Sequence, residues 1–120
     1  MSEHEAPPAD EFVLWDLRVV VESISGNCTC GMAVGDYFEL KGGKLFLPDG
    51  KYFCVYALAS TLPLLPAKQR PLHRADWMQT DTRIACPDPI CQLVMRADRV
   101  APRRLRHDDV SGVPLEAQGE

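Results

Sequence analysis

Alternation of apolar and polar residues between positions 16 and 24 predicts a β-strand with one buried face. Leu17, Val19 and Val21 fall on one side of such a strand, and charged residues interrupt the other side. Successive side chains of a strand point to opposite faces of a sheet, so the pattern indicates a strand that covers a hydrophobic core. The Ser25–Asn27 segment that follows is typical of a turn.

The same criteria predict four further strands and one helix. Apolar residues recur at helical spacing from Lys51 to about Leu65. Pro63 is expected to end or kink this helix because proline lacks a backbone N–H donor. The order β-β-β-α-β-β predicts an α+β fold, a small, mainly antiparallel sheet of about five strands with one helix packed on it. The further strands are expected at residues 35–40, 44–47, 82–86 and 91–97.

The chain length of 120 residues suits one domain with a modest core. We expect residues 12–106 to form this domain. Residues 1–11 are polar and acidic, and residues 107–120 lack periodicity, so both ends are expected to be disordered. The segment 66–81 has no predicted element and is long enough to act as a lid over a neighbouring site.

Composition and charge argue against several classes of function. The net charge of −4 disfavours a nucleic-acid-binding protein, which usually presents a basic face. No apolar run approaches the roughly 20 residues that a membrane span needs. The N-terminal segment lacks the basic and apolar regions of a secretory signal, so we expect a cytoplasmic protein with reduced thiols. The odd number of cysteines, 5, also fits a disulfide framework poorly.

These cysteines are the residues best able to carry chemistry. Cys28 and Cys30 form a C-x-C in a Gly-rich turn, and Cys86 precedes Cys91 by five residues. Because thiolates are preferred ligands of tetrahedral zinc, a bound metal ion is expected, with zinc as the first choice. Neither spacing is the C-x₂-C of zinc ribbons, and free cysteines are often simply buried, so inert cysteines are the alternative. The expected ligands are Cys28, Cys30, Cys54 and Cys86.

A softer donor set is a variant of this metal site. Met32 lies two residues after Cys30, and Cu(I) favours thiolate together with thioether ligands. A methionine beside a turn more often fills a gap in the core. Both interpretations of Met32 stay open at this point.

A catalytic thiol is a further interpretation. Cys86 would act as the nucleophile, with Asp88 or His73 as a general base. Trp77 and Tyr56 would then wall the pocket that binds the substrate. An aspartate between two prolines is also typical of a turn, where its side chain bonds the local backbone.

A basic run near the C-terminus supports an interaction module as another interpretation. Such a run suits an anionic ligand or an acidic partner. Acidic residues at the ends of this chain are equally available to the arginines, which makes a solvated, internally paired face the simpler interpretation. The run comprises Arg96, Arg99, Arg103, Arg104 and Arg106.

Several short motifs occur in a characteristic order between residues 16 and 97. They are Gly26-Asn-Cys28, a V-G-D-Y-F stretch, an apolar helix ending in L-P-L-L-P, Trp77, and an A-C-P-D-P stretch. This order resembles a family of small, uncharacterised prokaryotic proteins. The resemblance implies that Cys28 and Cys86 are motif cysteines and that Cys54 is a less regular one. The chain departs from the pattern at Met32, where a histidine is usual, and Cys30 and Cys91 are not motif positions.

We therefore expect a small cytoplasmic domain that binds a soft metal ion around Cys28, Cys54 and Cys86. The alternative is a small cysteine- or metal-dependent enzyme acting on a small organic substrate in a biosynthetic pathway. The third interpretation is a non-catalytic interaction module, and whether the protein is an enzyme stays open. The expected partners are a small-molecule ligand and a second copy of the chain, which exposed sheet edges would allow.

Overall fold

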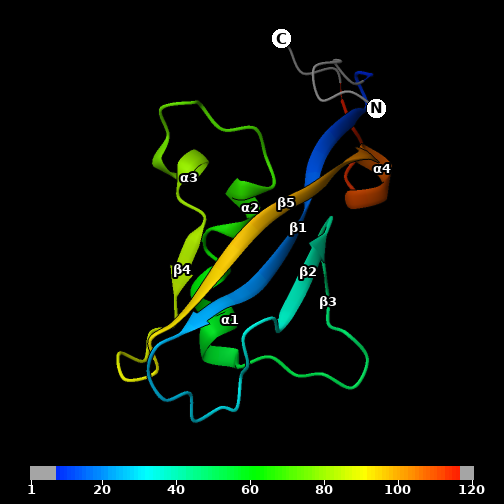
Figure 1. Cartoon of the computed structure of the whole chain (residues 1–120). Helices are drawn as coiled ribbons and strands as arrows, with labels where there is room; N and C mark the ends of the chain where they lie inside the picture. Colours follow the sequence, from blue (N-terminus) through cyan, green and yellow to red (C-terminus); the bar gives the residue numbers. More distant parts are fainter. Residues whose placement is uncertain (1–7, 117–120) are drawn as a thin grey trace.

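The computed structural model describes residues 8–116. Within them, a five-stranded antiparallel sheet has the strand order β3-β2-β1-β5-β4 (Figure 1). The predicted α+β fold, with three strands, a helical segment and two strands in that order, is confirmed. The strands are β1 (Glu11–Ile24), β2 (Tyr37–Lys41), β3 (Lys44–Phe46), β4 (Arg83–Ala85) and β5 (Leu93–Arg106).

β1 and β5 form a long two-stranded ribbon at the centre of the sheet (Figure 1). Their pairing runs from Glu11 opposite Arg106 to Ile24 opposite Leu93, with two irregularities in register. Both strands extend further than the sequence predicted. The added part of β1 is a continuous apolar run, residues 12–15, which has no alternation. The added part of β5 carries arginines paired with acidic side chains instead of alternating apolar residues.

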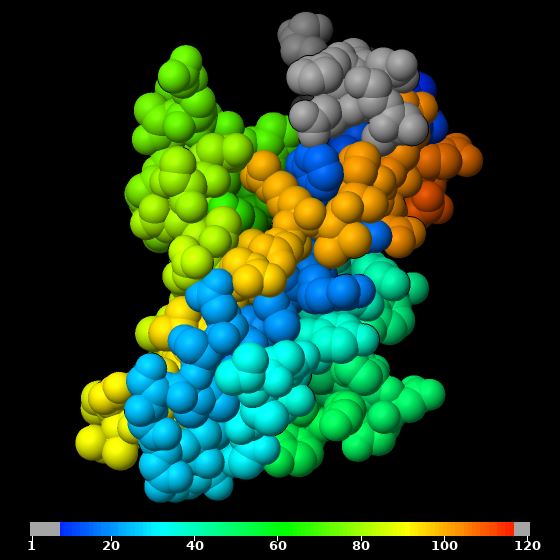
Figure 2. Space-filling model, in the orientation of Figure 1, coloured from blue at the N-terminus to red at the C-terminus, as the bar shows by residue number. Residues whose placement is uncertain are grey.

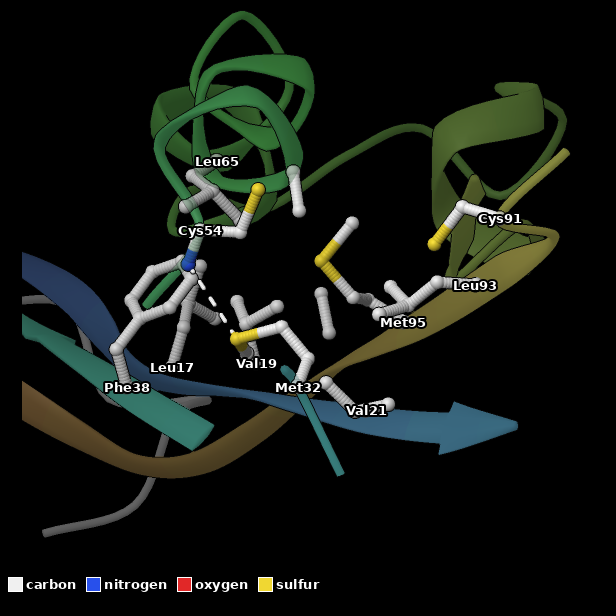
Figure 3. Packing of buried hydrophobic residues seen from close by; sticks show 12 residues of the cluster. Leu17, Val19, Val21, Met32, Phe38, Cys54, Leu65, Cys91, Leu93 and Met95 are labelled. Carbon is white, nitrogen blue, oxygen red and sulfur yellow. Dashed lines mark hydrogen bonds between the residues drawn. The ribbon is translucent and has the colours of Figure 1, made fainter. Parts of the chain in front are cut away.

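One face of the sheet is buried, and the other faces solvent. Leu17, Val19 and Val21 of β1 are at most 1% exposed, as their alternation predicted. Burial of each such side chain stabilises the fold by about 1.5–3 kcal/mol. On the opposite face, Arg18 pairs with Glu39 at 2.9 Å. The core (Figure 3) also contains Met32, Phe38, Cys54, Ala57, Leu65, Cys91, Leu93, Met95 and Ala97.

Two short helices, α1 (Val55–Thr61) and α2 (Leu65–Lys68), supply residues to the core beneath the sheet (Figure 1). They replace the single helix predicted for residues 51–65. Pro63 lies between them, where its missing backbone donor interrupts the helix as expected. None of the helices in the part of the chain that the structure describes is long and apolar enough to cross a membrane.

The segment 66–81 is not the unstructured loop that the sequence suggested, because it includes most of α2 and a further helix, α3 (Trp77–Thr80). Lys68 is only 6% exposed. Its ammonium group donates hydrogen bonds to three backbone carbonyls in and just after α3. Carbonyls at the end of a short helix lack partners within it, so Lys68 fixes α3 against α2.

The C-terminal end also differs from the prediction. Residues 107–120 were expected to be disordered, but His107–Val110 forms the helix α4, which packs against β5. The backbone N–H of His107 donates to the Asp10 carbonyl at 2.8 Å, so α4 is tied to the chain just before β1. The expected disorder of residues 1–7 and 117–120 lies outside the described residues.

Candidate functional site

All five cysteines border one cavity of about 470 Å³. Cys28 and Cys30 come from the loop after β1, Cys54 directly precedes α1, and Cys86 and Cys91 lie in the loop between β4 and β5. All five are free thiols. The fold therefore gathers three separate segments of the chain around one space. The other lining residues are Thr29, Tyr56, Ala57, Pro87, Asp88 and Leu93.

Backbone hydrogen bonds hold the loop after β1 against the loop before β5. The N–H of Gly26 donates to the carbonyl of Cys91 at 3.1 Å, and the N–H of Asn27 donates to the carbonyl of Ile90 at 3.1 Å. These bonds extend the pairing of β1 and β5 past the ends of the strands. Figure 2 shows the two loops side by side at one end of the molecule. Cys28 is therefore placed next to Cys91.

Gly26 permits this close approach because it has no side chain. A Cβ atom at this position would lie 1.9 Å from the Ile90 carbonyl oxygen and 2.8 Å from that of Cys91. Both oxygens belong to backbone, which cannot rotate aside as a flexible side chain can. The glycine of the Gly26-Asn-Cys28 motif is thus a packing requirement that positions Cys28.

A tight turn presents Cys28 and Cys30 to the cavity. The N–H of Gly31 donates to the Cys28 carbonyl at 3.2 Å. Gly31 adopts a φ of 75°, in the left-handed region that glycine tolerates best. The Tyr52 hydroxyl lies 3.0 Å from the Cys30 carbonyl and 3.1 Å from that of Gly31, and donates to this pair. The segment before α1 therefore fixes the turn from outside.

Neighbouring backbone N–H groups and the Cys91 thiol affect the pKa of Cys28. Partial burial raises the pKa of the Cys28 thiol, but backbone N–H from Met32 and the thiol of Cys91 lower it. The N–H groups of Cys30 and Gly31 lower this pKa further, so that it lies below the ordinary value for cysteine. Donors that favour the charged form stabilise a thiolate. The backbone of this loop therefore favours the thiolate form of Cys28.

The other thiols interact in pairs. A hydrogen bond with the Cys54 thiol, together with desolvation, raises the pKa of Cys30. Burial raises the pKa of Cys91 to about 11, with a further contribution from its hydrogen bond with Cys28. The charge of Cys86 raises the pKa of both Cys30 and Cys91. Cys86 thus lies within electrostatic reach of both pairs, Cys28 with Cys91 and Cys30 with Cys54.

The loop between β4 and β5 has a defined internal geometry. The N–H of Cys91 donates to the Asp88 carbonyl at 3.2 Å, and the Asp88 carboxylate accepts from the N–H of Ile90 at 3.0 Å. Asp88 therefore acts as a turn residue, the alternative that the sequence left open. Gln92 has a φ of 52°, the one left-handed non-glycine residue among positions 8–116. Such strain costs about 1–3 kcal/mol and tends to occur at functional loops.

Cys54 and Met32 meet in the core (Figure 3). The N–H of Cys54 donates to the Met32 sulfur at 3.4 Å. Met32 is 6% exposed and is not among the residues that line the cavity. Its placement agrees with the gap-filling role rather than with the thioether ligand. Cys54 itself is 7% exposed and lines the inner wall of the cavity.

The structure separates the residues predicted for catalysis and for the pocket wall. Cys86, Asp88 and Tyr56 all line the cysteine cavity, with Tyr56 71% exposed at its rim. Trp77 instead lines a separate, smaller crevice. His73 accepts a hydrogen bond from a nearby backbone N–H at 3.0 Å and does not line the cavity. No residue of the segment predicted as a lid reaches this cavity.

The arginines of the basic run, which lie on β5, bond within the chain. Arg103 donates to both carboxylate oxygens of Asp16, at 2.8 and 3.0 Å. Arg99 donates to two backbone carbonyls and lies over the Trp15 ring at 5.6 Å. This pairing agrees with the simpler, internally paired interpretation of the run. The remaining pairs are Arg96 with Glu22 and Asp98, Arg104 with Glu11, and Arg106 with Asp10.

The thiols surround the cavity without forming a preformed ligand cage. In residues 8–116, no group of three or more Cys, His, Asp or Glu side chains is arranged to hold a metal ion. Comparison with family models, with curated proteins and with solved structures finds no match for this chain. The resemblance to a small prokaryotic family therefore stays a prediction.

Proposed function

We propose that the cysteine cavity binds a soft metal ion through thiolates, with zinc as the preferred ion. The observation that carries this proposal is the convergence of all five cysteines on one cavity. Cysteines that served only as small apolar residues would have no reason to face the same space. The proposed ligands are Cys28, Cys30, Cys54 and Cys86.

Electrostatic interactions among the thiols support a cation at this site. Cys28 is stabilised as a thiolate by the surrounding N–H groups. The pKa of Cys30 is raised by its hydrogen bond with Cys54, by desolvation and by the charges of neighbouring cysteines, Cys86 included. A bound cation would remove this repulsion and favour the thiolate form of every ligand.

Binding would require the sulfurs to move closer together. Zinc–sulfur bonds are about 2.3 Å long, so four ligands must converge on one point. Rotation between staggered side-chain conformers is the simplest way to achieve this. Cys30 is exposed on its turn and has the most freedom to swing inward. Cys91 is the least suited ligand, because it is 3% exposed and its pKa of about 11 keeps the thiol protonated.

A competition titration with a chromophoric zinc chelator tests this proposal. Reduced protein is expected to take one zinc ion per chain away from the chelator. His73→Asn is a matched control because His73 is a zinc-capable side chain outside the cavity, and this variant should bind zinc as the wild type does. Failure to compete with the chelator would overturn the proposal. So would unchanged zinc binding when all four proposed ligands are replaced by serine.

A small cysteine- or metal-dependent enzyme is the second candidate function. The observation that favours it is the size of the cavity, about 470 Å³, which lies in the range of roughly 300–1,000 Å³ typical of small-molecule sites. Tyr56 at the rim and Asp88 in the wall would contact such a molecule. Catalytic zinc sites keep one position open for water or substrate. A metal shell of three sulfurs and one oxygen would favour this candidate, whereas four sulfurs would favour a structural ion.

A further inference from the structure

We propose that Cys28 and Cys91 are a redox pair, which a peroxide converts into a disulfide with Cys28 as the first sulfur oxidised. This reaction goes beyond metal binding and does not depend on it. It makes the pair a site of reversible covalent modification, since a disulfide in a reducing compartment can be reduced again by other thiols.

Contact between the two residues is the first observation behind this inference. Cys28 and Cys91 border the same cavity, and each thiol perturbs the pKa of the other. Disulfide geometry requires Cβ atoms about 3.5–4.5 Å apart, and only neighbouring cysteines satisfy it. The Gly26–Cys91 and Asn27–Ile90 backbone bonds join the two loops directly, so they hold the pair together without help from other segments.

Unequal exposure assigns different roles to the two sulfurs. Cys28 is half-buried at the cavity, where a molecule as small as a peroxide has access to it. Cys91 is 3% exposed and is shielded from reagents in solution. Cys28 therefore reacts with the oxidant, and the buried Cys91 then forms the disulfide with the oxidised Cys28.

The reaction proceeds in two balanced steps. The Cys28 thiolate attacks one oxygen of hydrogen peroxide, the O–O bond breaks, and the departing hydroxide takes a proton from solvent to become water. The Cys91 sulfur then attacks the Cys28 sulfenic acid. The S–O bond breaks, and the leaving oxygen departs as water with the proton released by Cys91. Two electrons pass from the two thiols to the peroxide, which is reduced to two molecules of water.

Cys54 also perturbs the pKa of Cys30, but the segments that carry these two cysteines are joined less firmly. Cys30 lies on an exposed turn. Side-chain contacts tie this turn to the segment carrying Cys54, one from the Tyr52 hydroxyl and one to the Met32 sulfur. No backbone bonds between the two segments are comparable to those at Gly26 and Asn27. The structure therefore favours Cys28–Cys91 over Cys30–Cys54 as the disulfide.

Treatment of reduced, metal-free protein with hydrogen peroxide tests the inference. The expected product is one intramolecular disulfide, seen as a mass decrease of two hydrogen atoms and mapped by proteolysis to Cys28 and Cys91. Because no metal is present, the result is independent of zinc binding, and either proposal can fail without the other. A disulfide that maps to Cys30 and Cys54, or the absence of any disulfide, would overturn the inference.

Three variants separate the roles of the two sulfurs. Cys91→Ser should abolish the disulfide and leave a sulfenic acid at Cys28 that a dimedone probe traps. Cys28→Ser should leave Cys91 reduced, because Cys91 is shielded. Thr29→Ser changes the same loop without removing a thiol and is the matched control, so it should form the same disulfide at the wild-type rate. Dimedone labelling of Cys91 in place of Cys28 would contradict the assigned roles.

Discussion

Replacing Gly26 by alanine is expected to destabilise the fold by about 3 kcal/mol, the upper end of the cost of overpacking a buried site. The new methyl group would lie 1.9 Å from the Ile90 carbonyl oxygen, so the two loops must separate. Separation breaks the Gly26–Cys91 and Asn27–Ile90 hydrogen bonds, worth about 1 kcal/mol each. Denaturant unfolding and thermal melting measure the effect, with a decrease in Tm of roughly 12 °C.

Gly43→Ala is the matched control for this change. Gly43 lies in the turn between β2 and β3, and no atom lies within 4 Å of the position that its Cβ would occupy. Stability is therefore expected to stay within about 0.5 kcal/mol of the wild type. Equal melting temperatures for Gly26→Ala and Gly43→Ala would show that the two loops are not held together as described.

Replacing Cys28 by serine is expected to weaken zinc binding by more than about 100-fold. Even the loss of a residue that only hydrogen-bonds a zinc ligand lowers metal affinity by about 10–100-fold. The hydroxyl of serine remains protonated near neutral pH and is a poor ligand for zinc. Backbone N–H groups that stabilise the Cys28 thiolate would then face a neutral hydroxyl in place of a charged sulfur. The chelator competition titration measures the change.

Cys91→Ser is the internal control for that titration. Cys91 is buried with a pKa of about 11, and a serine hydroxyl at this position can still donate to Cys28. Zinc affinity should therefore change only a few-fold. A larger loss from Cys91→Ser than from Cys28→Ser would mean that the fifth cysteine, rather than Cys28, is a principal ligand.

The central strands and their buried face were predictable because the core pattern is local. Leu17, Val19 and Val21 alternate in sequence, and all three are buried. The far half of the β1–β5 ribbon was not predictable from this pattern, since it depends on pairing between residues distant in sequence. Arg103 and Asp16, for example, bond across the ribbon although 87 residues separate them. Ion pairs of this kind leave no repeating pattern in the sequence of either strand.

The sequence predicted four of the five cysteines that line the cavity but not Cys91. The sequence indicated Cys28, Cys30, Cys54 and Cys86, and all four line the cavity. Cys91 was not among the expected ligands, yet it lines the same cavity. A signal was present in the turn-forming residues around Asp88, which fold the chain back so that Cys91 returns to the same space.

Trp77 and His73 were predicted near the site but do not line the cysteine cavity. Both lie in the segment 66–81, which was expected to cover the site. The sequence offered no sign that Lys68 would hold α3 against α2 instead. A buried lysine that bonds three carbonyls is a tertiary feature. It depends on where α3 packs, and side-chain spacing along the chain does not encode that position.

X-ray absorption at the zinc K-edge of zinc-loaded protein tests the central claim most directly, because it reports the atoms bound to the ion. Thiolate binding in the cysteine cavity predicts a first shell of sulfur at about 2.3 Å, close to four atoms per zinc. A first shell made of nitrogen and oxygen alone would contradict it, and would place the ion outside the cavity that the five cysteines surround.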